Sequence, residues 1–293
     1  MPGNVKLPPR RRASTGSWLL WGACLLAGCT QDATAPGQHL YVLTFDNSFG
    51  ILQTSIDTPG VYPVMEDTLT TYDITWSPDG RRVAFTREYY DTGQYSFRVV
   101  TYDTQTGNQQ ILTPGPDDYF QPAWSPDGTW IAYLSRPRGG FDATLRGIRP
   151  DATGDHQLGP LGYYVRPPRW SPDGRAIAAT RNDFMVVIVN ATTGALMDTI
   201  APGMSPTWSP DGRQLAFVSN SLTISNSLTI RNLDGGSTKV LPVTGYDPAW
   251  SPDGDWIAFD ADSGVHLVSP TATDTIGIRF IAPYTRPAWR LKQ

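Results

Sequence analysis

Short apolar runs, each a few residues long, recur along most of the chain. Stretches such as Arg82-Val83-Ala84-Phe85 and Trp256-Ile257-Ala258-Phe259 follow tight-turn sequences and show the period of two that is typical of β-strands. Further apolar runs follow each of them, for example Phe97 to Tyr102 and Gln110 to Leu112. The pattern predicts an all-β chain of short strands.

A pentapeptide repeat organises these strands. Trp-Ser-Pro-Asp-Gly begins at five tryptophans, and a sixth Trp near the C-terminus follows the same Pro-Ala pair as two of them; the six residues are Trp76, Trp124, Trp170, Trp208, Trp250 and Trp289. Their spacings are 48, 46, 38, 42 and 39 residues. The Pro-Asp-Gly segment predicts a tight turn between two antiparallel strands, A and B. The period fits a propeller blade of four strands, A to D.

The two ends of the chain complete each other. Leu40 to Phe45, Ile51 to Ile56 and Val61 to Met65 supply strands B, C and D without a preceding A strand, and Pro287-Ala288-Trp289 supplies an A strand without successors. Pairing them predicts a six-bladed β-propeller of four-stranded antiparallel blades, closed by the C-terminal strand, which leaves no long exposed sheet edge.

The repeat, with Pro-Ala-Trp-Ser-Pro-Asp-Gly followed by Ile-Ala-Phe or Ile-Ala-Tyr, resembles the TolB-type, WD-repeat-like propeller. The resemblance covers residues 39–293 and implies the propeller fold. It also implies the cell envelope, because TolB is a periplasmic propeller that partners a lipoprotein. The small α/β domain that precedes the propeller in TolB has no counterpart in the approximately ten residues before residue 39.

Residues 1–28 have the features of a signal peptide, with a basic segment before an apolar core and small residues after it. Leu26-Ala27-Gly28-Cys29 resembles the bacterial lipobox, which implies a lipid anchor on Cys29, with residues 29–38 as a flexible tether. The alternative is a plain signal peptide with an incidental cysteine. Thr rather than Asp after Cys29 resembles the outer-membrane type, so we expect an exported, membrane-anchored lipoprotein at the outer membrane, in the periplasm or at the cell surface.

Composition excludes several classes of function. Beyond residue 28 the chain carries 19 basic and 27 acidic residues, a net charge of −8, so nucleic acid is not an expected partner. The three histidines, His39, His156 and His266, fall in different repeats, and no P-loop, haem motif or nucleophile elbow occurs. We therefore predict no cofactor, no metal site and no catalytic residue, and we interpret the repeated turn aspartates as structural.

Tyrosine and arginine gather in the D-to-A and B-to-C connections, opposite the pentapeptide turns. These residue types are favoured at binding hot spots, and loops on a rigid scaffold commonly carry function. The candidate binding face consists of Tyr72, Asp73, Tyr89, Tyr90, Tyr119, Phe120, Arg136, Arg138, Tyr163, Tyr164, Arg166, Tyr246, Asp247, Tyr284 and Arg286. The alternative is that these aromatic residues pack between blades and complete the core.

Three functions fit these features. The leading prediction is a non-catalytic, membrane-anchored interaction module that binds an envelope protein, peptide or glycan. The second is a propeller enzyme of the lyase, hydrolase or lactonase type with polar groups in its central funnel, for which Asp73 and Asp247 at equivalent positions are the one hint. The third is a structural subunit of an envelope complex.

Overall fold

The computed structural model describes residues 41–47, 50–54, 62–66, 70–91, 93–159, 164–220, 225–261, 264–271, 274–278 and 286–291. All of them belong to the unit Gln38–Gln293. Their regular secondary structure consists of 23 strands, and no helix among them is long and apolar enough to cross a bilayer. The predicted signal segment 1–28 and tether 29–38 lie outside the described residues.

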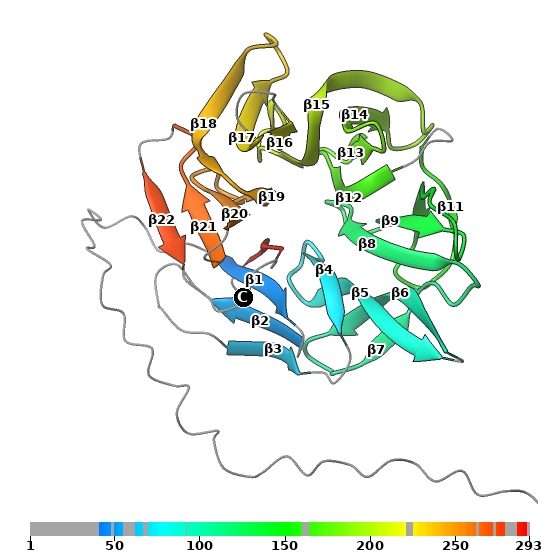
Figure 1. Cartoon of the computed structure of the whole chain (residues 1–293). Coiled ribbons are helices and arrows are strands. Elements are labelled where there is room, and N and C mark those ends of the chain that lie inside the picture. The colour runs from blue at the N-terminus through cyan, green and yellow to red at the C-terminus, as the bar shows by residue number, and fades with distance from the viewer. Residues whose placement is uncertain are drawn as a thin grey trace, which may run out of the picture. The chain divides into compact units, whose positions relative to one another are not determined.

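The strands form antiparallel blades, which we number 1 to 6 and give from the innermost strand outward (Figure 1). Blade 1 comprises β23 (Ala288–Leu291), β1 (Tyr41–Asn47), β2 (Gly50–Thr54) and β3 (Tyr62–Glu66). Blade 2 comprises β4 (Thr71–Trp76), β5 (Arg82–Asp91), β6 (Gln94–Asp103) and β7 (Gln109–Ile111). Blade 3 comprises β8 (Asp118–Trp124), β9 (Ile131–Arg136), β10 (Thr144–Ile148) and β11 (His156–Gln157).

Blades 4 and 5 share a strand. Blade 4 comprises β12 (Tyr164–Trp170), β13 (Ala176–Arg181), β14 (Met185–Asn190) and the first part of β15 (Leu196–Trp208). Blade 5 comprises the last part of β15, then β16 (Gln214–Asn220), β17 (Ser225–Asn232) and β18 (Thr238–Thr244). Blade 6 comprises β19 (Tyr246–Trp250), β20 (Ile257–Ala261), β21 (Gly264–Val268) and β22 (Thr275–Ile278).

The shared strand explains why the described residues form five hydrogen-bonded sheets, one of them seven-stranded. Residues 196–202 of β15 pair with β14, and residues 203–208 pair with β16. Gly203 stands where the partner changes, and a Cβ there would lie 2.8 Å from the carbonyl oxygen of Val218. The seven-stranded sheet is therefore two blades joined by one continuous strand.

The ring closes as predicted. β23 pairs with β1 through Leu43 and Trp289 and their neighbours. The inner strands contact one another in a closed series, from β23 through β4, β8, β12, β15 and β19 back to β23. The all-β propeller is confirmed, and this strand pairing is consistent with six blades.

The B strands pack differently from their sequence pattern. Five consecutive residues of β9 and of β13 are buried, so no solvated face alternates with the core. Each B strand lies inside its blade and is covered on both faces by neighbouring blades, which favours apolar residues at successive positions. The repeated alanines, Ala84, Ala132, Ala216 and Ala258, are fully buried, in agreement with the close approach that their small size predicts.

The repeat tryptophans join adjacent blades. The indole Nε1–H of Trp170, Trp208 and Trp289 donates to a backbone oxygen of the preceding blade at 2.9–3.0 Å. Successive pentapeptide turns also lie against each other. At Gly128, which has φ +71°, a Cβ would lie 3.5 Å from the ring of Pro78 in the turn of the preceding blade. The turns thus form a continuous contact series on one face of the propeller.

Each pentapeptide turn is closed by its own serine and aspartate. In blade 3 the Ser125 hydroxyl donates to Asp127 at 2.6 Å, and the backbone N–H of Thr129 donates to the same carboxylate at 3.0 Å. These hydrogen bonds hold the pKa of Asp127 below its usual range. The geometry supports the structural interpretation of the turn aspartates.

We expect the acid stability of the protein to depend on these turns. A carboxyl group whose pKa is lower in the folded state contributes stability above its unfolded pKa of about 3.9 and loses it as the pH falls through the folded value. Asp127→Asn should therefore lower the free energy of unfolding at pH 7 and flatten its decrease below pH 4. Urea unfolding at a series of pH values measures both effects, and the exposed Asp142→Asn serves as control. An unchanged pH profile in Asp127→Asn would contradict this role.

Candidate functional site

An irregularity in the inner strands turns side chains toward the propeller axis. The A–B register is shifted just before the repeat tryptophan in blades 2 to 6. In four of these blades the residue three positions before the tryptophan has a left-handed backbone: Asp73 (φ 57°), Gln121 (φ 58°), Ser205 (φ 53°) and Asp247 (φ 47°). Such conformations cost roughly 1–3 kcal/mol each for non-glycine residues and concentrate at functional sites.

Threonines of neighbouring B strands hold two of these bulges in place. The backbone N–H of Gln121 donates to the hydroxyl oxygen of Thr86 at 2.9 Å, and that of Ser205 donates to Thr180 at 3.1 Å. Both hydrogen bonds cross from one blade to the next. The surrounding blades therefore compensate for the unfavourable backbone.

The bulges surround a pocket of about 560 Å³ on the propeller axis. Its lining comes from five of the six blades and consists of Tyr72, Asp73, Thr86, Phe97, Phe120, Gln121, Arg136, Arg166, Tyr246, Asp247, Asp260 and Arg286. Eight of the fifteen residues of the candidate binding face are among them. The sequence pattern predicted that these residues share one face of the propeller. Their role in binding stays a prediction.

An ion-pair network crosses the pocket where the ring closes. Arg286 of blade 1 pairs with Asp73 of blade 2 and, at 3.1 Å, with Asp247 of blade 6. The Asp73 and Asp247 side chains are only 7% and 12% exposed. Asp247 also accepts a hydrogen bond from the Ser205 hydroxyl at 2.6 Å. One guanidinium thus links the closing blade to both of its neighbours.

The rest of the lining is aromatic and basic. The hydroxyl group of Tyr72 donates to Glu88 at 2.7 Å, and that of Tyr246 accepts from the Asn226 amide at 2.6 Å. Phe120 lies beneath the Arg136 guanidinium, 5.1 Å from its ring centre. Hydrogen bonds or a stacked cation therefore orient three of the aromatic rings.

Two arginines of β12 differ from Arg286 of the ion-pair network in their surroundings. Arg166 lines the pocket, and its guanidinium approaches the Met204 sulfur at 3.6 Å. Arg169 donates to the Pro168 carbonyl at 3.1 Å; burial lowers the pKa of its guanidinium, and the charge of Asp247 opposes that shift. No carboxylate of the described residues lies within 4 Å of either guanidinium.

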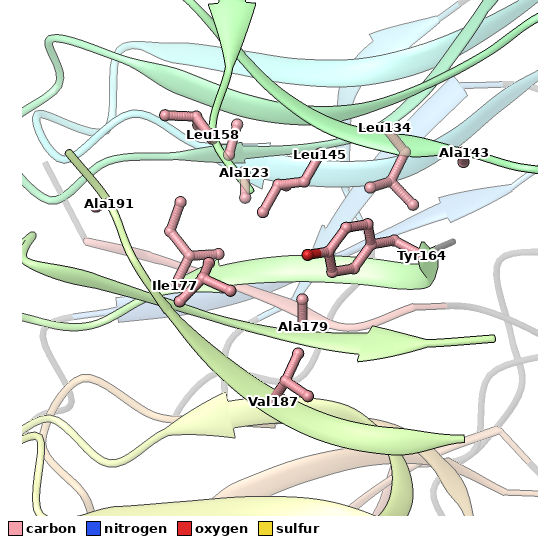
Figure 2. Close-up of a cluster of buried hydrophobic side chains, with 12 residues drawn as sticks. Ala123, Leu134, Ala143, Leu145, Leu158, Tyr164, Ile177, Ala179, Val187 and Ala191 are labelled. Atoms are coloured by element: carbon pink, nitrogen blue, oxygen red, sulfur yellow. The ribbon is translucent and has the colours of Figure 1, made fainter. Parts of the chain in front are cut away.

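Five of the other seven candidates are described by the structure and do not line the pocket. Tyr119 and Tyr164 are 8% and 2% exposed and belong to the core, where burial raises the pKa of both hydroxyl groups. Figure 2 shows the Tyr164 ring among apolar side chains that include Leu145 and Ala179. For these two tyrosines the structure supports the alternative that aromatic residues complete the core.

The remaining candidates fall outside the pocket lining or outside the described residues. Tyr90 is exposed and packs against Tyr95 with ring centres 4.9 Å apart. Tyr89 and Arg138 are accessible but do not line the pocket. Tyr163, Tyr284 and the predicted lipidation residue Cys29 lie outside the described residues.

Several residues in the pocket wall or next to it were not among the sequence candidates. Gln121 and Ser205 occupy the same position relative to the repeat tryptophan as Asp73 and Asp247, so aligning the repeats would have found them. The same alignment marks Arg169, which stands where the other repeats have threonine or alanine. Thr86, Phe97 and Asp260 come from the B and C strands and carry no local signal of their own.

Histidine, cysteine and acidic side chains are the groups that could hold a metal ion. Within the described ranges, no group of three His, Cys, Asp or Glu side chains is arranged to hold a metal ion. His156 in β11 packs on Trp130 with ring centres 4.7 Å apart, and His266 in β21 packs on Phe259 at 5.6 Å. These two histidines therefore pack against aromatic rings in different blades.

The described part of the chain is a β-propeller with a polar and aromatic pocket at its axis. Residues 82–267 match the TolB beta propeller domain, and the chain belongs to this family. The uncharacterized peptidase YuxL of Bacillus subtilis is 32% identical over 127 residues, which are 40% of this chain and 19% of that protein. The chain thus spans about a fifth of that relative's length.

Solved structures share the fold. The crystal structure of TolB from Acinetobacter baumannii has a TM-score of 0.73 at 16% identity, covering 87% of this chain and 68% of that one. Oligogalacturonate lyase from Vibrio parahaemolyticus has a TM-score of 0.55 at 13% identity, covering 77% of this chain and 74% of that one. At these identities the likeness shows the fold alone.

Proposed function

We propose that this chain is a non-catalytic binding module of the cell envelope that holds a ligand or partner in the axial pocket. The observation that carries the proposal is the convergence of eight candidate residues on one pocket of about 560 Å³. Pockets of this size, with aromatic walls and a few oriented polar groups, are typical ligand sites. Left-handed residues concentrated around its rim add to this argument.

The proposal includes export and membrane anchoring through a lipid on Cys29. Its support is the lipobox-like Leu26-Ala27-Gly28-Cys29 after a basic and apolar leader, together with the envelope location that the TolB resemblance implies. Two or more acyl chains make a durable anchor, because each buried methylene contributes roughly 0.8 kcal/mol.

Site-specific photocrosslinking in cells tests the binding module. Tyr72→benzoylphenylalanine places the crosslinker in the pocket, and Arg175→benzoylphenylalanine places it at a pentapeptide turn as control. After solubilisation in detergent, we expect the Tyr72 position to crosslink a defined envelope component and the Arg175 position not to do so. Equal crosslinking from both positions would contradict a pocket-centred function. Intact mass and membrane fractionation of Cys29→Ser, which should lose the lipid, test the anchor.

The second candidate is a propeller enzyme of the lyase, hydrolase or lactonase type, favoured by three carboxylates, Asp73, Asp247 and Asp260, in one pocket. Its weakness is that Arg286 already pairs with two of them. Crosslinking of no macromolecule from the Tyr72 position would direct the search toward a small-molecule or enzymatic role.

A further inference from the structure

The charge distribution around the pocket bears on what the pocket binds. Three guanidinium groups line it, from Arg136, Arg166 and Arg286. Arg286 is neutralised by Asp73 and Asp247, and Arg136 pairs with Asp118 at 3.4 Å. Asp260 is 5% exposed and has contacts of its own. Arg166 is the pocket guanidinium that lacks a carboxylate partner among the described residues.

The repeat makes the position of Arg166 informative. The equivalent residues, four before each repeat tryptophan, are Tyr72, Phe120, Met204 and Tyr246 in the other blades that have the pentapeptide. All are uncharged, so the fold itself does not require a cation at this position. Because removing a charge from water costs free energy, a partly buried arginine with no carboxylate partner among the described residues favours a site for an anion.

Arg169 places a second positive charge on the same strand, β12. The other repeats carry Thr75, Ala123, Thr207, Ala249 or Ala288 at this position, which again shows that the fold does not require a cation. Arg169 as a whole residue is partly buried; burial lowers the pKa of its guanidinium, and the negative charge of Asp247 in the pocket wall opposes that shift. β12 thus contributes two guanidinium groups that have no carboxylate of the described residues within 4 Å.

The aromatic walls indicate which kind of group the ligand carries next to its anionic group. Tyr72 and Tyr246 are 39% and 38% exposed, and their hydroxyl groups are already hydrogen-bonded to protein groups. Both side chains therefore offer exposed ring surface to a ligand. Such rings stack against a flat apolar group or the apolar face of a sugar.

From this arrangement we infer that the axial pocket binds a carboxylate-bearing part of its ligand, with the carboxylate held by Arg166 and the adjoining group between the aromatic walls. A planar guanidinium matches a carboxylate by two parallel hydrogen bonds, which favours this anion. The positive charge of Arg169, on the same strand, adds long-range electrostatic attraction for the ligand carboxylate. The inference rests on the proposed binding function and specifies its ligand chemistry.

Matched pairs of probes, each differing only in the charge of the carboxylate, test the inference. One pair is N-acetylphenylalanine and its amide, representing a peptide end, and the other is trigalacturonate and its methyl ester, representing an acidic sugar. Isothermal titration of the full chain in detergent measures both. We expect at least one acid to bind at least tenfold more tightly than its neutral partner, and to bind more weakly as salt increases.

Variants taken from the repeat itself use side chains that the equivalent positions of other blades carry. Arg166→Met introduces the residue found in blade 5, and Arg169→Thr the residue found in blades 2 and 5. Loss of a charged hydrogen bond predicts about 10- to 100-fold weaker binding of the acid for Arg166→Met, with partial recovery in Arg166→Lys. Arg175→Met, 86% exposed at a pentapeptide turn, is the charge-matched control.

The outcomes separate this inference from the proposed function. Selective binding of one acid that Arg166→Met weakens supports the inference and identifies the peptide or sugar source. Equal binding of acid and neutral partner, or binding unaffected by Arg166→Met, overturns the carboxylate preference and leaves the pocket as a binding site. Failure of both acids to bind at 10 mM also overturns it, whereas crosslinking at Tyr72 still decides the proposed function.

Discussion

Deleting residues 288–293 is expected to lower the free energy of unfolding by more than about 4 kcal/mol, because it removes β23 and opens the ring. β23 supplies the inner strand of blade 1. It also donates the Trp289 indole bond to Ala249 of blade 6 at 2.9 Å, and it stacks Arg290 on Trp76 of blade 2 at 4.3 Å. Without it β1 becomes an unpaired edge, and such edges favour aggregation.

Urea unfolding followed by circular dichroism, with size-exclusion chromatography, measures this effect. The milder Trp289→Ala should cost about 3 kcal/mol, since it removes a large packed side chain and an interblade hydrogen bond. Phe141→Ala, at a side chain 95% exposed, provides the control and should stay within about 0.5 kcal/mol of the wild type. A truncated chain that unfolds at the wild-type urea concentration would show that β23 does not close the ring.

The closure could be predicted because it depends on local signals at both ends of the chain. In the sequence, the strands of residues 41–66 have no A strand before them, and Trp289 is the repeat tryptophan that no Ser-Pro-Asp-Gly turn follows. The shared strand β15 could not be predicted in the same way. It depends on Gly203 allowing the chain to pass from one blade to the next without a break in strand geometry, and a glycine in this context also occurs in ordinary turns.

The candidate site shows a similar division. The loops that carry pocket residues were found from their content of tyrosine, aspartate and arginine, but the direction of each side chain was not. Tyr72 stands four residues before its tryptophan and lines the pocket, whereas Tyr164 stands six before and is buried. Strand alternation would place both on one side. β12 carries register shifts on both sides of Arg166, and these break the alternation.

Arg286→Met is expected to lower the free energy of unfolding by about 3 kcal/mol, because it leaves two largely buried carboxylates without the guanidinium that bridges them. The effect should exceed that of an ordinary surface ion pair, since Asp73 and Asp247 are 7% and 12% exposed and solvent screens them little. It should also exceed the effect of a single interblade hydrogen bond, because the lost side chain ties blade 1 to blades 2 and 6. Urea unfolding at pH 7 provides the measurement.

Two comparisons decide whether the charge is the cause. Arg181→Met removes an exposed pair with Asp183, whose side chains are 34% and 48% exposed, and should cost no more than about 0.5 kcal/mol. The triple variant Asp73→Asn, Asp247→Asn, Arg286→Met removes all three charges and should recover most of the lost stability, because a buried charge that has lost its partner costs more than a neutral side chain in its place. A triple variant no more stable than Arg286→Met would show that packing around Arg286, rather than its charge, joins the blades.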